Sequence, residues 1–434
     1  MAIEGVLALG SFYMNNLDAK ILELSKRGNE EDMLEAEKLL EHALQDDPQN
    51  TDLLLKLAIL VQEFPYVDLS IPRLEKILSY DPDNALALLI LAETNHHLYS
   101  EISKPLFDKL TSVTTGNAEI DSMLRYAASW FYDSWFYDNN PNDYELEKLL
   151  LESINICQSH VNNYEALAEL YMRQARYSEA KIMMQKAIKN VTKIYTKEIF
   201  AAETRDMTDV QKFLALYVKG TYVTDTSSLK RLAAEANIRE KLDDNPNNIE
   251  LLLQLALVEK TNSWNQSDES IISIKKILSY DPDNPVALII WAYRACCVDE
   301  KLFKILISTE MNDAEINSML LRVASWFYID KDDKKREKLL LQSINKYQQH
   351  VKPYYELATL YSKQGKNEEA RKLWKKALDN IKVYSNSDSI NYIIEAPSQD
   401  GPEYIVDVNE FLNTAIKGTH TLTSVVEDLK KKAG

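Results

Sequence analysis

Small and apolar residues recur at helical spacing along much of the chain, and residues 162–188 are one example. The recurring residues in this stretch are Leu167, Ala168, Tyr171, Ala180, Met184 and Ala187. Spacings of three, four and seven place such residues on one face of a helix. The pattern breaks near Ala175 and Arg176, so the stretch is predicted to form two helices joined by a short turn.

The same pattern of apolar and polar positions occurs twice along the chain. Four segments of the first half return in the second half in the same order: 76–92 as 276–292, 118–132 as 314–328, 147–155 as 337–345, and 209–221 as 407–419. Repetition of long segments in one order indicates a duplicated structural unit. We therefore predict two similar helical lobes, at residues 1–228 and 229–434.

Residues 352–378 match 162–188 and add a glycine at the turn. The pattern residues are Leu357, Ala358, Tyr361, Gly365, Ala370, Trp374 and Ala377. This order of a large–small pair, an aromatic residue, a turn glycine and spaced alanines resembles the tetratricopeptide repeat of about 34 residues. The resemblance implies an all-α fold, an α-solenoid of antiparallel helix hairpins that forms a superhelix. Segments 192–208 and 385–403 depart from the motif and are predicted to be longer connections.

The resemblance also implies a binding surface, because the first helix of each hairpin in this family faces a concave groove. Carried over by motif spacing, the groove positions of the first lobe are Leu55, Ile59, Glu93, Glu165, Glu169 and Arg173. Those of the second lobe are Leu253, Leu257, Tyr293, Tyr355, Thr359 and Lys363. We therefore expect a non-enzymatic protein-binding adaptor or scaffold.

A second candidate surface is an unusual run of aromatic residues. Trp130, Phe131 and Tyr132 recur in the second half at 326–328 and are expected to pack inside both lobes. A further triplet of Trp135, Phe136 and Tyr137 has no counterpart. If exposed, these three residues would anchor a protein partner. The alternative is a locally extended helix that buries them against a neighbour.

Charge and cysteine content narrow the class of partner and the compartment. The net charge is −17, and the pI is about 5.0. Such acidity disfavours nucleic acid and suits a protein or peptide partner, possibly a basic one. Cys157, Cys296 and Cys297 cannot form a disulfide framework, and the first residues lack the basic character of a secretory signal. We expect a cytoplasmic protein without membrane insertion.

No residue pattern predicts catalysis, a metal or a cofactor. The six histidines are scattered, and the pair His96 and His97 points in different directions on a helix. His160 and His350 match between the halves and are expected to lie at helix ends. The 9 glycines form no phosphate-binding loop.

Three other functions stay open at this point. An immunity or antitoxin protein would bind and occlude one partner enzyme, and an acidic chain suits a basic toxin. A self-assembling structural protein and an enzyme with an unrecognised helical site are the others. Neither the partner nor the oligomeric state follows from the sequence.

Overall fold

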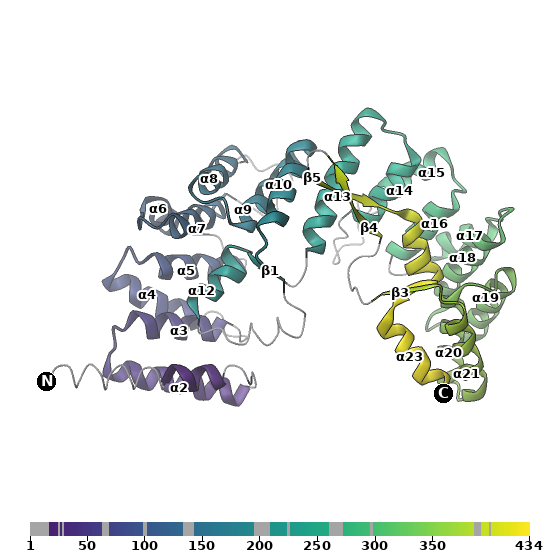
Figure 1. Cartoon of the computed structure of the whole chain (residues 1–434), viewed down its shortest axis with the longest axis horizontal. Helices are drawn as coiled ribbons and strands as arrows, with labels where there is room; N and C mark the ends of the chain where they lie inside the picture. Colours follow the sequence, from purple (N-terminus) through teal and green to yellow (C-terminus); the bar gives the residue numbers. More distant parts are fainter. Residues whose placement is uncertain are drawn as a thin grey trace. The chain divides into compact units, whose positions relative to one another are not determined.

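The computed structural model consists of helical hairpins in two compact units, unit 1 (Met1–Leu229) and unit 2 (Lys230–Gly434) (Figure 1). The predicted lobes divide one residue earlier. The residues that the structure describes are 17–24, 27, 30–62, 69–98, 102–132, 143–194, 209–223, 226–259, 272–295, 298–385, 392–398 and 401–434.

Unit 1 is a row of helices that pack in sequential pairs. A helical stretch at 17–24 is followed by α2 (Glu30–Asp46), α3 (Thr51–Gln62), α4 (Ser70–Tyr80), α5 (Ala85–His97), α6 (Lys104–Ser112), α7 (Ala118–Ser129), α8 (Asp143–Ile156), α9 (Val161–Arg173) and α10 (Tyr177–Asn190). The odd-numbered helices α3 to α9 are the first members of their hairpins, and each packs on the even-numbered helix that follows. Small residues permit this close approach, since Ala168 and Ala180 are fully buried in the α9–α10 pair.

Unit 2 repeats this arrangement. Its helices are α13 (Ser227–Asp244), which begins just before the boundary, α14 (Ile249–Val258), α15 (Ile272–Tyr280), α16 (Pro285–Arg294), α17 (Glu300–Ser308), α18 (Ala314–Ser325), the short 3₁₀ helix η4 (Trp326–Tyr328), α19 (Asp333–Lys346), α20 (Val351–Lys363) and α21 (Asn367–Asp379). Here α14, α16, α18 and α20 are the first helices of the hairpins.

The turn between two hairpins is set by a short polar motif present in both units. Asp81 ends α4, and the side chain of Asn84 accepts a hydrogen bond from the backbone N–H of Ala87 at 3.0 Å. In unit 2, Asn284 caps α16 in the same way at 2.9 Å. An asparagine before the first helical residue satisfies one of the free N–H groups of the helix start.

After the last hairpin of each unit, one segment of the chain runs back along the first helices of the hairpins. In unit 1 this inner segment (209–223) contains α12 (Val210–Phe213), the π-helical turn η2 (Leu214–Val218) and β2 (Tyr222–Val223). In unit 2 it is residues 407–422, with α22 (Val408–Phe411), η5 (Leu412–Lys417) and β6 (His420–Leu422). Figure 1 shows α12 beside α3.

Short strands fix the end of each inner segment. β2 pairs in parallel with β1 (Lys193–Ile194), and β6 pairs in parallel with β3 (Val383–Ser385). Unit 2 also contains an antiparallel hairpin of β4 (Ile393–Ser398) and β5 (Gly401–Val406). The longer connection predicted at 385–403 therefore contains strands, at β4 and the first residues of β5. The last helix, α23 (Thr423–Ala433), packs on α21 and buries Leu429.

Candidate binding surfaces

In unit 1 the inner segment is held against the first helices by polar contacts. The ammonium group of Lys219 lies 2.7 Å from a carboxylate oxygen of Glu119 on α7. The side-chain amide of Asn162 on α9 donates hydrogen bonds to the carbonyl oxygens of Tyr217 and Val218, each at 3.1 Å. Because these contacts come from different helices, the segment spans several hairpins.

Unit 2 holds its inner segment in the same place with an additional buried cation. Lys417 pairs with Glu315 on α18 at 2.7 Å, as Lys219 pairs with Glu119. Arg322, only 5% exposed, donates a hydrogen bond to the carbonyl oxygen of Ile416 at 2.7 Å and pairs with Glu356 at 2.7 Å. The equivalent residue of unit 1 is Tyr126.

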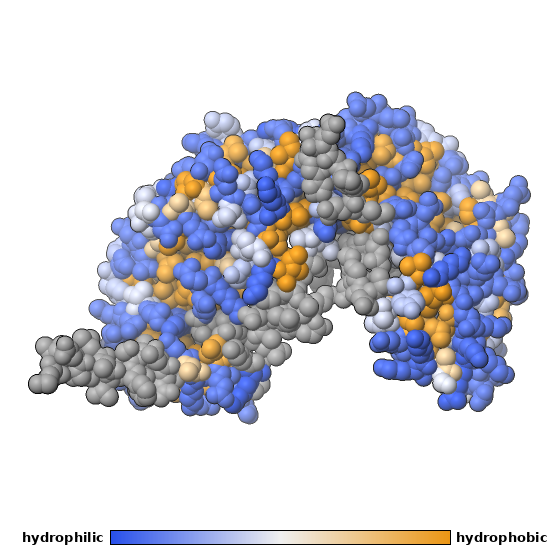
Figure 2. All heavy atoms as spheres, viewed as in Figure 1, coloured by the Kyte–Doolittle hydropathy of each residue, from blue (hydrophilic) through white to orange (hydrophobic). Residues whose placement is uncertain are grey.

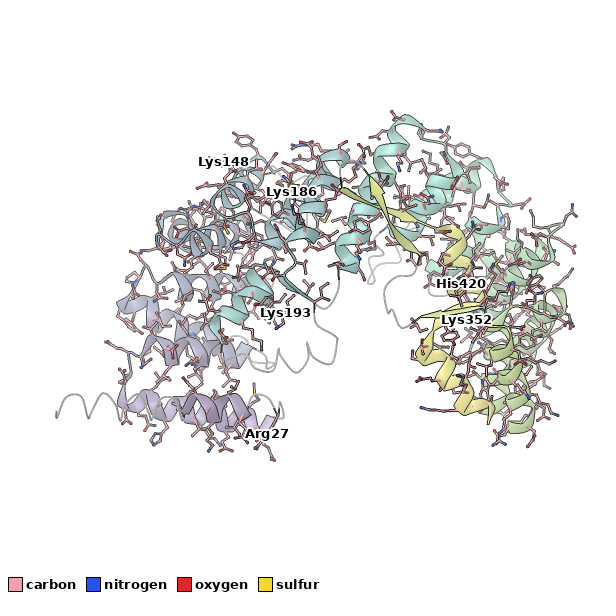
Figure 3. All side chains as sticks on the ribbon, in the orientation of Figure 1. Arg27, Lys148, Lys186, Lys193, Lys352 and His420 are labelled. Carbon is pink, nitrogen blue, oxygen red and sulfur yellow. The ribbon has the colours of Figure 1, made fainter. Side chains whose placement is uncertain are left out.

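A glycine in each inner segment permits close contact with the helix behind it. Gly220 has a φ of +64°, and a β-carbon at this position would collide with the Asn162 side chain. Gly418 has a φ of +71°, and a β-carbon at this position would collide with the side chain of Lys352 on α20. Figure 3 shows Lys352 beside the strand that carries His420. Only glycine combines this backbone conformation with this lack of space.

The inner segments change the expected groove. Leu55, Ile59 and Leu257 are 3%, 0% and 3% exposed, and α12 contacts α3 as α22 contacts α14. These three residues therefore offer no surface to a partner while the inner segment is in place, and the expectation of an open groove requires correction there. Sequence spacing could not show this, because the covering segment lies far away in the chain. Leu253 is half-buried.

Other predicted groove positions keep part of their surface. Tyr293 is 45% exposed, although its ring contacts Phe411 of the inner segment with centroids 5.0 Å apart. Half-buried side chains are those of Glu93, Glu165, Glu169, Tyr355 and Thr359, whereas Arg173 and Lys363 are exposed. Their role in binding stays a prediction.

Glu93 and Tyr293 occupy equivalent positions with different chemistry. Burial raises the pKa of the Glu93 carboxyl to about 7, because the charged form loses its hydration. Tyr293 presents a ring at the same position. The inner faces of the two units therefore differ in polarity at this position.

Of the two neighbouring aromatic triplets predicted to matter, the structure describes only the first. Phe131 packs on Phe107 with ring centroids 4.6 Å apart, and Phe327 packs on Phe303 at the same distance. Trp130 is 8% exposed. The further triplet of Trp135, Phe136 and Tyr137 lies outside the described residues.

The matched histidines lie in buried polar clusters. His160 Nδ1 lies 3.1 Å from Ser122 Oγ, and His350 Nδ1 lies 2.9 Å from Ser318 Oγ. Burial lowers the pKa of both imidazoles to about 4. Both histidines lie at the N-cap positions of α9 and α20, and neither side chain caps its helix. The expectation that they contact the terminal carbonyl oxygens of a helix end was therefore wrong. With each histidine 1% exposed, these serine–histidine contacts are closed to substrate.

Within the described ranges, no group of three or more metal-ligating side chains comes together. The part of the chain that the structure describes likewise contains no helix long and apolar enough to cross a membrane.

The outer faces of the two units differ at the second helices of the last two hairpins. On α8, Tyr144 is 74% and Leu151 38% exposed. They border a hollow of about 650 Å³ lined by Tyr144, Glu147, Lys148, Leu151, Glu152, Asn155 and Ile156. The matching positions on α19 carry Lys334 for Tyr144 and Lys346 for Ile156.

The same replacement occurs on the next outer helix. Ile182 on α10 is 44% exposed, and its counterpart on α21 is Lys372. Residues 143–192 contain 6 basic and 7 acidic residues, whereas the matching residues 333–382 contain 13 basic and 6 acidic residues. The net charge therefore changes from −1 to +7. The sequence analysis missed this surface, although comparing charges between the aligned halves would have found it.

Comparisons with known proteins agree with the repeat pattern. Tetratricopeptide-repeat family models match residues 161–190 in unit 1 and 339–372 in unit 2. No curated protein sequence matches the chain significantly.

Similar solved structures include the complex of Naa15 and Naa10 bound to HypK-THB, at 12% identity over 84% of this chain and 63% of that chain, with a TM-score of 0.26. Yeast Tom70 is similar at 14% identity over 84% and 93%, with a TM-score of 0.28. The human IFIT1 dimer with PPP-AAAA is similar at 15% identity over 81% and 69%, with a TM-score of 0.31. Thus the chain spans less than two thirds of the Naa15 complex chain. One segment in each unit is thus similar to the tetratricopeptide repeat, and both units are built of helical hairpins.

Proposed function

We propose that this protein is a non-enzymatic adaptor that binds other proteins through both of its units. The observation that carries the proposal is the presence of a tetratricopeptide repeat in each unit. Stacked hairpins of this kind give extended surfaces suited to protein segments. The free thiol of Cys157 suits a reducing compartment such as the cytoplasm.

The outer face of α8 is the contact surface we propose for unit 1. Tyr144 and Leu151 supply exposed apolar area, and Glu147 and Glu152 surround it with carboxylates. Exposed aromatic and aliphatic side chains in a hollow are typical anchors of protein interfaces. A partner with apolar and basic side chains would complement this surface, in line with the predicted basic partner.

Affinity capture from a native lysate, followed by mass spectrometry, tests the adaptor function. The Tyr144→Ala/Leu151→Ala variant should lose partners that the parent chain captures. Lys304→Ala/Ile307→Ala, at two exposed positions of α17, is the control for changes on an outer helix. The absence of any partner enriched over a folded, unrelated helical protein would remove the proposal.

A further inference from the structure

We propose that unit 2 binds an acidic segment of a partner protein on a basic face formed by Lys334, Lys338, Arg371, Lys372 and Lys375. The proposal rests on the adaptor function and names the class of one partner. All five side chains are exposed, the first two on α19 and the others on α21. Both helices pack on α20. Figure 2 shows mainly hydrophilic residues over this part of unit 2.

The spacing on α21 forms a stripe rather than scattered charges. Arg371 and Lys375 are four residues apart and therefore lie one above the other on the helix surface, with Lys372 beside them. On α19, Lys334 and Lys338 have the same spacing and are followed by Leu341, which is 39% exposed. The stripe on α19 thus covers about two helical turns, and the one on α21 about one.

These five cations are not used by the fold. Among the residues that the structure describes, no carboxylate pairs with any of them, whereas neighbouring Lys335 and Lys346 pair with Asp332 and Glu310. Unpaired cations on adjacent turns repel one another, at a cost of a few tenths of a kcal/mol per pair. An anionic partner would remove this repulsion.

Unit 1 shows that the repeat does not require these charges. The matching residues on α10 are Lys181 for Arg371, Ile182 for Lys372 and Gln185 for Lys375. By contrast, the buried alanines Ala180 and Ala187 are retained as Ala370 and Ala377. Because the core is the same and the outer face is not, the basic face serves a purpose specific to unit 2.

An acidic protein segment fits this face better than a nucleic acid. Single-stranded nucleic acids are held by aromatic side chains on which bases stack. α19 has no aromatic residue, and Trp374, the single one on α21, packs into the hydrophobic cluster beneath. Four of the five cations are lysines, which bind as point charges and not as bidentate phosphate clamps. Carboxylates four residues apart on a helix would match the stripe on α21.

Fluorescence anisotropy with a short labelled polyglutamate peptide tests the proposal on the full chain. We expect binding at low salt that weakens as salt is added, because exposed charges are screened. Arg371→Glu/Lys372→Glu/Lys375→Glu should weaken it at least tenfold. The matched unit 1 variant Lys181→Glu/Ile182→Glu/Gln185→Glu should bind the peptide like the parent chain. Equal circular dichroism and thermal midpoints would show that both variants fold.

Three results would overturn the proposal: no binding of polyglutamate at low salt, equal loss in both variants, or tighter binding of a single-stranded DNA oligonucleotide that only the unit 2 variant loses. Binding confined to phosphatidylserine vesicles would also overturn it, in favour of a membrane surface. Sedimentation of the chain alone would detect self-association through the same face. In that case the occupant of the basic face would be a second copy of the chain.

The outcome is distinguishable from that of the adaptor test. If the chain captures partners through α8 but ignores polyglutamate, only the acidic-segment proposal fails. If it binds polyglutamate but captures no protein, the adaptor function fails.

Discussion

Units 1 and 2 hold their inner segments alike but present different outer faces. The pairs Lys219–Glu119 and Lys417–Glu315 join equivalent residues at the same 2.7 Å. On the outside, exposed Ile182 corresponds to Lys372. Contacts that close a unit tolerate few changes, because buried polar groups need their partners. The comparison indicates that the two units agree in how they fold and differ in the outer surfaces they present.

Breaking the anchor that only unit 2 has should produce the largest effect. Arg322→Met leaves Glu356 half-buried without its main partner and removes the hydrogen bond to Ile416. We expect unit 2 to lose about 3–5 kcal/mol, as for other buried ion pairs that lose one member. Hydrogen exchange by mass spectrometry should show that residues 407–422 exchange faster than in the parent chain. The exchange rate of residues 209–223 should not change. Exposed Lys335→Met is the control. Equal protection of 407–422 in both variants would contradict the anchoring role.

Lowering the pH should weaken both units through the feature they share. His160 and His350 have a pKa of about 4 when folded, against about 6.5 when unfolded. Their stabilisation is complete above pH 6.5 and is lost as pH falls towards 4, because the unfolded chain takes up more protons. Each histidine contributes up to roughly 3 kcal/mol of this loss. Chemical unfolding between pH 7 and 4 measures it.

The matched chain for the pH experiment is His160→Gln/His350→Gln, which should lose less stability over this range. Both chains should carry Glu93→Gln, because the raised pKa of Glu93 acts in the opposite direction, with stability lost as pH rises from 4.5 towards 7. Parallel pH profiles with and without the histidines would refute the assignment.

A smaller effect should follow from filling the space at Gly220. Gly220→Ala adds a methyl group where Asn162 lies and forces a positive φ on a side chain, so unit 1 should lose roughly 2 kcal/mol or more. Gly116→Ala is the control, because Gly116 also has a positive φ, +78°, but has open space around it. A thermal shift no larger than that of Gly116→Ala would mean that the close contact is unimportant.

The smallest expected effect is at the turn inside the last hairpin of each unit. Ala175 has a φ of +57°, and its counterpart Gly365 has a φ of +76°. Ala175→Gly should therefore stabilise unit 1, and Gly365→Ala should destabilise unit 2, each by about 1 kcal/mol. Changes of the same sign in the two denaturation midpoints would count against this explanation.

Helical hairpins and repeat boundaries followed from the sequence because their signals are local. Leu167 and Ala168 are fully buried, as the spacing of apolar residues predicted, and so are Leu357 and Ala358. Such residues face a neighbouring helix only a few positions away in the chain, and helical periodicity records that directly.

The covering of the groove could not be predicted in this way. The repeated segment at 209–221 was visible, but its place along the hairpins depends on contacts between distant residues, such as Lys219 with Glu119 on α7, 100 positions apart. The prediction that Leu55 and Ile59 are helical was thus correct, whereas the prediction that they are exposed in a groove was wrong. The β4–β5 hairpin was missed because its prolines and polar residues suggested an irregular loop.

The inner segments also set the order in which each unit can be completed during synthesis. The helices from α2 to α10 leave the ribosome before residues 209–223, so Leu55 and Ile59 stay without their cover until the last part of the unit has been made. A nascent chain stopped before residue 209 therefore exposes an apolar face that the finished protein never shows, which makes it a target for chaperones and proteases.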